Sequence, residues 1–205
     1  MNIVLPDNKG IQEAVNALIC DEVVAYPTET VYGLAVNPFS ERALNKLFQV
    51  KGRQENKPVL LVVGNIEQIY ELVINISDKA KKCIEKFWPG PLSLLLPCKQ
   101  ELSKKLTAGQ GKICIRWTSH PIAQKLSLEF GHAITSTSAN RSGELPANTI
   151  EELPKEGINV AIKSEIQIRK EPSTVFDPDL CKILREGTIK KGELEKILEE
   201  KVYIE

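Results

Sequence analysis

The stretch VVAYPTETVYGLAV (residues 23–36) joins two short apolar runs through a polar centre, and this pattern decides the fold. The first run, VVAY, has the composition of a strand and stops at Pro27, and LAV is a second apolar run. Hydroxyl groups that follow a strand end can bind a carboxylate or a phosphate. We therefore predict that YPTETVYGL belongs to an anion-binding active site. The alternative is a capping motif, in which Thr28 or Thr30 starts a helical turn and Glu29 is exposed.

Helices and short strands alternate on both sides of this stretch. Helices are predicted at 8–21, 40–48, 65–73, 77–87, 119–130, 149–153 and 190–200, and strands at 23–26, 34–36, 58–63, 93–96, 112–117, 133–135, 158–162, 174–177 and 182–185. No repeat or linker divides the chain. The pattern predicts one α/β domain over residues 1–205, with a core from about 8 to 190, a closing helix at about 190–200, and a mixed sheet covered by helices.

The spacing of apolar residues predicts which side chains face the core. The first helix places four of them on one face: Ile11, Val15, Leu18 and Ile19. The run PVLLVV at 58–63 is continuously apolar, as expected of a strand that is covered on both faces. The run KICIRW alternates, so its two isoleucines lie on one side and the other three side chains on the opposite side: Lys112, Cys114 and Arg116.

Composition favours a small anionic ligand. The 205 residues contain 27 Lys+Arg and 27 Asp+Glu, so the formal net charge is zero. Proteins that bind a nucleic-acid backbone usually carry a basic excess, and charges gathered in a cleft focus potential on a small anion instead. The five cysteines include no C-x-x-C, which favours reduced, mostly buried thiols over a disulfide scaffold or a zinc site. The two histidines lack metal-ligand spacing, so no metal site is predicted.

Several familiar patterns are missing from the sequence. The N-terminus has no signal-peptide pattern and the longest apolar runs are far shorter than a membrane span, so we expect a cytoplasmic protein with no membrane partner. There is no G-x-x-x-x-G-K-[ST], and LTAGQGK at 106–112 has the wrong spacing for one. There is also no G-x-G-x-x-G, G-x-S-x-G or H-E-x-x-H. A nucleotide would therefore bind without the usual loop.

Two further polar clusters follow predicted elements. In Lys51-Gly52-Arg53, with Lys57 beyond, two cations flank a glycine and can both reach one polyphosphate. The alternative is that these cations only complement a helix dipole. The segment STSAN at 136–140 offers hydroxyls and an amide to a phosphate or a ribose. The alternative there is a hydrogen-bonded turn that leads into a loop.

Taken in order, the segments PTETVYGL, KGR…KP, FWPGPLSLLL, KICIRW…HP, STSANRSG, PSTVFD and ILREG resemble the YrdC/Sua5/TsaC family, over about residues 8–190. The length resembles the short, YrdC/TsaC type. The resemblance implies a single-domain α/β fold, a twisted open mixed sheet with helices packed on it, and a basic concave cavity. It also implies a nucleotidyltransferase that forms threonylcarbamoyl-AMP, pyrophosphate and water from L-threonine, bicarbonate or CO2, and ATP, for N6-threonylcarbamoyladenosine in tRNA.

The resemblance implies partners as well. Mg2+ would accompany the ATP, and the adenylate would pass to a separate transferase complex that acts on tRNA. It leaves open whether the chain itself binds tRNA or double-stranded RNA.

The resemblance assigns roles to single residues. Lys51 and Arg53 are the expected catalytic pair, facing the phosphates and the carbamoyl group, and we expect both to be solvent-accessible. The residues expected to bind threonine are Thr30, Arg116, Ser136, Ser173 and Thr174. Those expected to bind ATP are Arg53, Lys57, Lys112, Ser138, Asn140, Pro146 and Arg185.

Two positions depart from the family pattern. Val62 stands where archaeal members tend to carry a histidine, and Pro146 lies in a loop where another serine is common. In the implied reaction, a threonine carbamate attacks the α-phosphorus of ATP, and cations stabilise the charge that develops on the phosphoryl oxygens. The sequence identifies no general base, and Glu29 has no assigned role.

Two other functions are compatible with parts of the pattern. One is a carbamoyl-adenylate-forming enzyme, like the YrdC-like domain of hydrogenase-maturation carbamoyltransferases, although the zinc-finger and acylphosphatase segments of those proteins are not found here. The other is a module that binds double-stranded RNA or tRNA through a basic face. Zero net charge argues against this as the sole role, because tracking phosphates requires several cations on one face.

Overall fold

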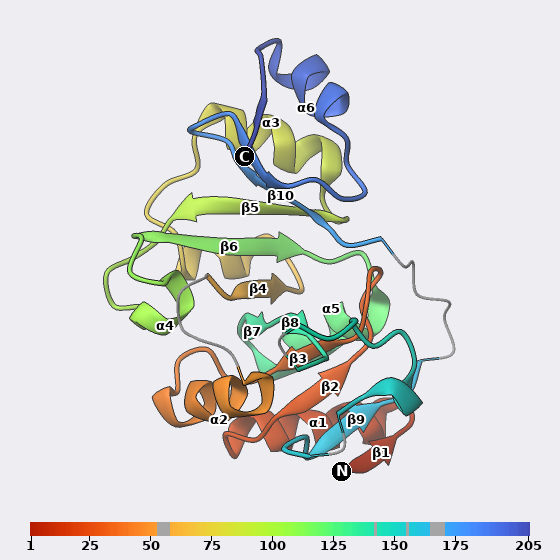
Figure 1. Ribbon diagram of the computed structural model, residues 1–205. Helices are drawn as coiled ribbons and strands as arrows, with labels where there is room; N and C mark the ends of the chain where they lie inside the picture. Colours follow the sequence, from red (N-terminus) through yellow and green to blue (C-terminus); the bar gives the residue numbers. More distant parts are fainter. Residues whose placement is uncertain (53–57, 142, 155, 165–170) are drawn as a thin grey trace.

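The computed structural model describes residues 1–52, 58–141, 143–154, 156–164 and 171–205, which form two β-sheets with helices packed against them (Figure 1). The predicted α/β class is confirmed, whereas the predicted single mixed sheet is wrong. The reason lies in two very short strands, Ile134–Thr135 and Thr137–Ser138, which belong to different sheets and are separated by Ser136 alone. Two-residue strands leave no periodicity from which such a change of sheet can be predicted.

The smaller sheet has the strand order β1-β9-β2-β3-β8. Its strands are β1 (Asn2–Val4), β9 (Val160–Ile162), β2 (Val24–Tyr26), β3 (Gly33–Ala35) and β8 (Thr137–Ser138). β1 and β2 pair in parallel with β9, whereas β3 pairs antiparallel with both β2 and β8. Tyr26 lies opposite Gly33, so residues 27–32 connect two neighbouring antiparallel strands.

The larger sheet has the strand order β12-β11-β10-β5-β6-β4-β7. Its strands are β12 (Tyr203–Ile204), β11 (Lys182–Arg185), β10 (Thr174–Asp177), β5 (Leu92–Pro97), β6 (Lys112–Trp117), β4 (Leu60–Val63) and β7 (Ile134–Thr135). It is also mixed: β5 runs parallel to β10 and antiparallel to β6, and β4 runs parallel to β6 and antiparallel to β7. Strands β1, β8 and β12 were not predicted from the sequence.

Six α-helices and two 3-10 helices are found among the described residues. The α-helices are α1 (Asn8–Ile19), α2 (Glu41–Lys51), α3 (Asp78–Phe87), α4 (Lys104–Thr107), α5 (Pro121–Phe130) and α6 (Lys191–Leu198), and the 3-10 helices are η1 (Glu67–Glu71) and η2 (Ile150–Glu152). Ser40 caps α2, because its hydroxyl accepts a hydrogen bond from the amide of Ala43. Helices α3 and α6 pack together at one end of the molecule, beside β5 and β10 (Figure 1).

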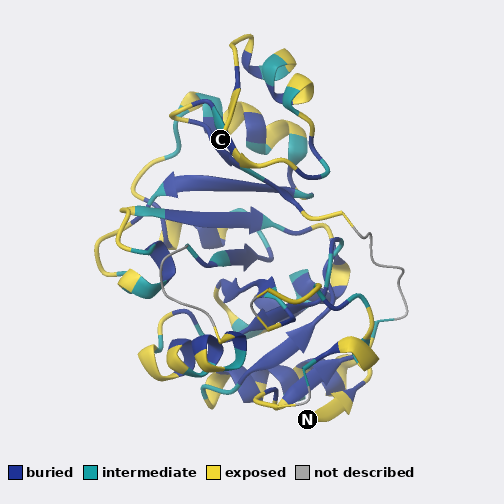
Figure 2. Cartoon of the chain, viewed as in Figure 1, coloured by how far each residue is buried: buried dark blue, intermediate teal, exposed yellow. Residues whose placement is uncertain are grey.

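The core consists of two hydrophobic clusters, and strands such as β2 and β4 lie between them, with one cluster on each face. In β2, Ala25 belongs to the larger cluster, whereas Val24 and Tyr26 belong to the smaller one, together with α1 and α5. β4 is divided in the same way, with Val62 in the smaller cluster and its neighbours in the larger. The prediction that PVLLVV is covered on both faces is confirmed for Leu61, Val62 and Val63, whereas Pro58 and Leu60 are only half-buried. Figure 2 shows the central strands buried and the outer sides of the helices exposed.

Two helical predictions are wrong in detail. Ile19 is 63% exposed, because it is the last residue of α1 and lies about 100° around the helix from the buried Leu18. The helix predicted from Asn65 is only the short η1, and Tyr70 within it is 60% exposed. Two residues after η1, Val73 forms an isolated antiparallel bridge with Cys98, which directly follows β5.

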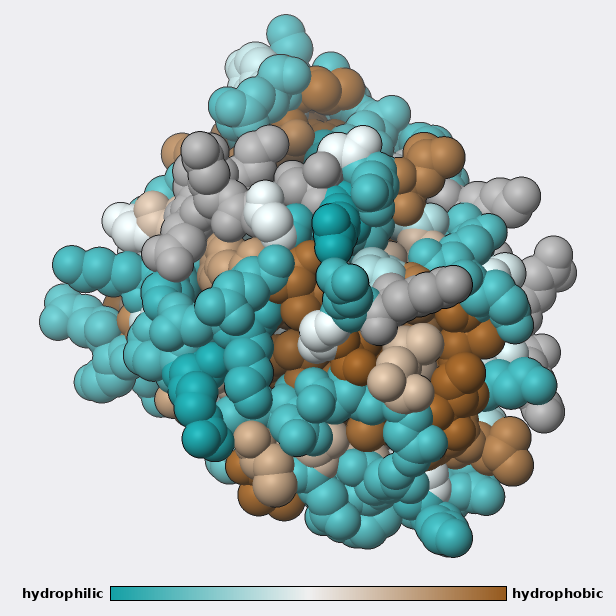
Figure 3. Space-filling model, turned by 60° about the horizontal axis from the view of Figure 1, so that its bottom comes forward, coloured by the Kyte–Doolittle hydropathy of each residue, from teal (hydrophilic) through white to brown (hydrophobic). Residues whose placement is uncertain are grey.

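The surface seen in Figure 3 is mainly hydrophilic, with hydrophobic residues gathered toward the centre and one side of that face. In the part of the chain that the structure describes, no helix combines the length and the apolarity that crossing a membrane requires. All five cysteines are free thiols, and four of them are buried, as predicted.

Candidate active site

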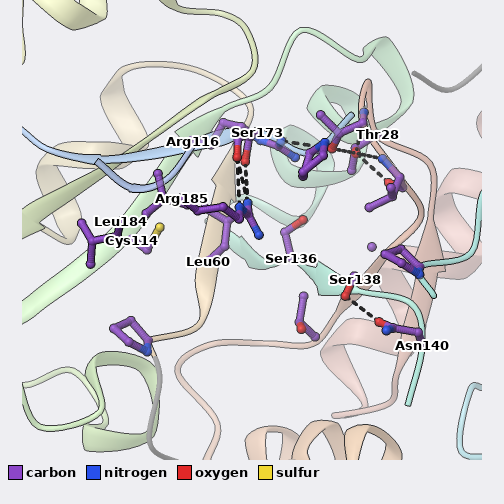
Figure 4. A pocket seen from close by; sticks show the side chains of 18 of the residues that line it. Thr28, Leu60, Cys114, Arg116, Ser136, Ser138, Asn140, Ser173, Leu184 and Arg185 are labelled. Atoms are coloured by element: carbon purple, nitrogen blue, oxygen red, sulfur yellow. Dashed lines mark hydrogen bonds between the residues drawn. The ribbon is translucent and has the colours of Figure 1, made fainter. Parts of the chain in front are cut away.

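A cavity of about 880 Å³ is lined by residues from both sheets. The connection between β2 and β3, the end of α2, the segment that follows β7, and strands β6, β10 and β11 all contribute to it (Figure 4). Its polar and charged lining includes Thr28, Thr30, Lys51, Gln110, Arg116, Ser136, Thr137, Ser138, Asn140, Ser173, Arg185 and Glu205. The change of sheet at Ser136 thus places the STSAN segment on the wall of this cavity.

Lys51 is the last residue of α2, and its side chain contacts the STSAN segment. Its ammonium group donates to the carbonyl oxygens of Ser138 (2.6 Å) and Asn140 (2.7 Å), to Asn140 Oδ1 (2.7 Å) and to Ser138 Oγ (3.3 Å). Gly52 ends the helix in the left-handed conformation, at φ 56°. We expected Lys51 to be solvent-accessible, and this is wrong: it is 4% exposed, because these oxygens surround its charge.

The two threonines of the PTET segment have different surroundings. The Thr28 hydroxyl donates to the carbonyl of Val31 (2.7 Å) and accepts from the amides of Thr30 and Val31, so it forms the local turn that the capping alternative describes. The Thr30 hydroxyl accepts from Arg116 NH1 at 3.3 Å. Thr28 therefore forms a local turn, whereas Thr30 contacts a cation that lines the cavity, and the anion-binding role of the segment stays a prediction.

Arg116 and Cys114 confirm the predicted alternation of β6. Both line the cavity, whereas Ile113 and Ile115 belong to the larger hydrophobic cluster. Burial raises the pKa of the Cys114 thiol to about 12, against the opposing effect of the arginines Arg185 and Arg116. This thiol is therefore protonated at neutral pH and lines the cavity as a small apolar group.

Behind Arg116 lies a cluster that the sequence analysis missed. Thr118 Oγ1 donates to Glu29 Oε2 at 2.5 Å, and Arg116 Nε lies 3.7 Å from Glu29 Oε1. The Glu29 side chain is only 13% exposed, so the expectation that it is exposed, part of the capping alternative, is wrong. His120, 3% exposed, lies near both charges. The contacts span about ninety residues of sequence, and only the threonine and histidine that follow KICIRW could have suggested them.

Ser173 and Arg185 form a third polar group on the cavity wall. Arg185 donates to the Ser173 carbonyl from Nε (3.2 Å) and from NH2 (2.9 Å), and its NH2 also donates to Ser173 Oγ (Figure 4). The Ser173 hydroxyl further lies 2.9 Å from Ser93 Oγ. Pro146 also lines the cavity, as does Ser136.

Two of the described residues singled out from the sequence, Lys112 and Thr174, are not among those that line the cavity. Lys112 instead binds both carboxylate oxygens of Asp177 (2.7 and 2.8 Å) and one of Asp179 (3.1 Å). The Thr174 hydroxyl donates to the Ile189 carbonyl and accepts from two backbone amides. Arg53 and Lys57, which were also expected to bind ATP, lie outside the described residues.

The burial of His120 predicts a pH dependence of stability. Burial lowers its pKa below the ordinary 6.5, and Arg116 adds to this effect while Glu29 opposes it. Below pH 6.5 the unfolded chain therefore binds a proton that the folded chain does not, and the free energy of unfolding falls as the pH drops. We expect the His120→Leu variant to lose less stability than the wild type between about pH 7.5 and about pH 5.5, measured by urea unfolding. If the His120→Leu variant had the same pH dependence as the wild type, the effect could not be attributed to the buried His120.

The sequence of the chain is similar to those of known proteins. The family model described as "Telomere recombination", which covers Sua5, YciO and YrdC proteins, matches residues 16–187. The threonylcarbamoyl-AMP synthase of Photobacterium profundum is 35% identical over 183 residues, which make up 87% of this chain and 99% of that protein. The threonylcarbamoyl-AMP synthase of Bacillus subtilis is 35% identical over 195 residues, or 92% of this chain and 56% of that protein.

A solved structure is similar over the whole chain. Sua5 from P. abyssi, in complex with L-threonine, superposes with a TM-score of 0.94 at 30% identity, covering 100% of this chain and 63% of that one. The present chain thus spans little more than half of the Bacillus protein and nearly all of the Photobacterium protein.

Proposed function

Because the chain belongs to the Sua5/YciO/YrdC family, we propose that it is a threonylcarbamoyl-AMP synthase. It converts L-threonine, bicarbonate and ATP into threonylcarbamoyl-AMP, pyrophosphate and water. With CO2 in place of bicarbonate, the same adenylate and pyrophosphate form, a proton is released and no water is formed. The observation that carries this proposal is the single cavity in which Lys51, Arg116 and Arg185 meet hydroxyl and amide side chains from both sheets. Its volume of about 880 Å³ falls within the usual range of small-molecule sites.

The polar groups of the cavity divide into two sides. Arg116 and Thr30, joined by a hydrogen bond, form one side with Ser136 and Ser173, and this side binds threonine, with Arg116 on its carboxylate. On the other side, Lys51, Ser138, Asn140 and Pro146 bind ATP. Arg185, which donates hydrogen bonds to Ser173 on the first side, also contacts ATP. Three cations against one lining carboxylate, Glu205, make the described part of the cavity basic, which favours two anionic substrates.

The chemistry then follows from charge. The threonine carbamate attacks the α-phosphorus of ATP and pyrophosphate leaves, so negative charge develops on the phosphoryl oxygens. Lys51 is a preorganised cation for this charge, since four oxygen contacts fix its ammonium group before the substrates bind. Arg53, outside the described residues, is its proposed partner. Mg2+ prefers oxygen ligands, and Glu205 is the one carboxylate in the described lining, so the phosphates of ATP would supply most of its ligands.

The wider role follows from the product. The adenylate carries an activated threonylcarbamoyl group, and a separate transferase complex in the cytoplasm consumes it to modify adenosine in tRNA. In this proposal, residues 1–205 act as one catalytic domain, and any binding of tRNA or double-stranded RNA is secondary, since the chain has no net positive charge.

Pyrophosphate release provides the direct test. Incubated with ATP, Mg2+, bicarbonate and L-threonine, the protein should release pyrophosphate at a rate that falls to background when threonine is omitted. A coupled pyrophosphatase assay measures the rate, and mass spectrometry identifies threonylcarbamoyl-AMP. D-threonine is the matched control, because it has the same charges with the opposite hand.

The outcomes separate the alternatives. Pyrophosphate release that needs carbamoyl phosphate instead of threonine and bicarbonate would indicate a carbamoyl-adenylate-forming enzyme. Tight binding of double-stranded RNA that is insensitive to ATP, without any pyrophosphate release, would indicate an RNA-binding module. Either result would refute the proposed synthase.

A further inference from the structure

Two buried atoms behind the cavity wall face each other without a hydrogen-bond partner among the described residues. They are Glu29 Oε1 and Arg116 Nε, which lie 3.7 Å apart. This distance is longer than a hydrogen bond but within the range of an ion pair. The other carboxylate oxygen of Glu29 is held by Thr118 at 2.5 Å, and Arg116 NH1 is held by Thr30.

The guanidinium group of Arg116 needs this carboxylate. Arg116 is 2% exposed, and burying a cation is costly unless an opposite charge lies close to it. Arg185, another charged group of the described lining, lies close enough to interact with Arg116. Because its charge is also positive, it does not offset the cost of burying Arg116. Glu29 is the only carboxylate that forms an ion pair with Arg116 in the described part of the chain.

Glu29 does not itself line the cavity. Thr28 and Thr30, its neighbours in sequence, do so, while the Glu29 side chain turns away toward Thr118 and the start of α5. A group in that place is not in contact with a substrate in the cavity, so its effect must pass through Arg116.

We propose that Glu29 is a positioning residue: together with Thr118, it holds the guanidinium group of Arg116 in the orientation that binds the carboxylate of threonine. This inference rests on the proposed function, because that function assigns the threonine carboxylate to Arg116. Thr118 fixes one carboxylate oxygen of Glu29, and the other oxygen faces Nε, so the guanidinium plane is held from behind while Thr30 holds NH1 from the side.

Substrate affinities provide the first experiment, with L-threonine and ATP titrated separately by calorimetry. The Glu29→Gln variant keeps the size of the side chain and a partner for Thr118 but loses the charge. We expect its Kd for threonine to rise about tenfold, as one charge-assisted contact is lost, while its Kd for ATP changes less than about twofold. The matched control is Glu71→Gln, which removes a carboxylate that pairs with an exposed histidine on the surface.

A second variant tests whether Thr118 acts through Glu29. Thr118→Val removes the 2.5 Å hydrogen bond and keeps the shape of the side chain. We expect a smaller loss of threonine affinity than in Glu29→Gln, and no additional loss in the double variant, because both changes act through Arg116. Additive losses, equal losses of threonine and ATP affinity, or an unchanged threonine affinity in folded Glu29→Gln would each overturn the proposal.

A ligand-free measurement separates this inference from the proposed function. The Nε–H signal of Arg116, assigned with Arg116→Lys, should be observable by NMR in the wild type and should shift or broaden in Glu29→Gln. If this happens while the wild type binds no threonine, Glu29 still orients Arg116 and the proposed function has failed. If the wild type binds threonine and the signal is the same in both proteins, Glu29 does not orient Arg116.

Discussion

Replacing Lys51 with alanine is expected to lower the rate of threonine-dependent pyrophosphate release about a thousandfold and to destabilise the folded protein by about 3 kcal/mol. The catalytic loss follows from removing a fixed cation at the site where charge develops on the phosphoryl oxygens. The loss of stability follows from burial, because alanine leaves the oxygens of Ser138 and Asn140 without the donor that they share.

The two effects can be measured separately. Urea unfolding followed by circular dichroism gives the stability, and the pyrophosphate assay, run at a temperature where the variant is fully folded, gives the rate. Lys46→Ala is the matched control, since Lys46 lies on the same helix and outside the cavity lining. Activity within tenfold of the wild type in folded Lys51→Ala would remove Lys51 from the catalytic role, and unchanged stability would contradict the buried network.

How far the sequence predicts this site depends on the distance between the interacting groups. The alternation of KICIRW correctly placed Cys114 and Arg116 on one face, because strand periodicity is a local property. Lys112 is on the same face by that rule, yet it pairs with Asp177 and Asp179. These aspartates lie some 65 residues away in sequence, and no local pattern could have predicted the pairing.

The same limit explains the other differences between prediction and structure. A cation at the end of a helix is usually exposed, and Lys51 is buried only because a segment nearly ninety residues later surrounds it. Thr28 forms a turn that the local sequence suggests, whereas the contact between Thr30 and Arg116 depends on how the two sheets are placed. The fold class was predictable from periodicity, but the division into two sheets depended on β7 and β8, which have two residues each.

The second large effect is expected for Arg116→Met, which should weaken threonine binding at least about a hundredfold, because a buried bidentate donor is lost. It should also destabilise the protein by about 2 kcal/mol, since Glu29 would remain largely buried beside an apolar side chain. The double variant Glu29→Gln/Arg116→Met removes both charges together. We expect it to recover most of the lost stability and none of the threonine affinity.

This double variant distinguishes two origins of the defect. If Arg116 served mainly to stabilise the fold, the double variant would recover threonine binding together with stability. If Arg116 contacts the substrate, the recovered stability cannot restore threonine binding, because methionine does not bind the carboxylate. Urea unfolding measures the first quantity and calorimetric titration with L-threonine the second. Threonine affinity that recovers together with stability would refute the assignment of the threonine carboxylate to Arg116. A double variant that is less stable than Arg116→Met would refute the ion pair with Glu29, because neutralising an unpaired buried carboxylate cannot destabilise the folded state through that charge.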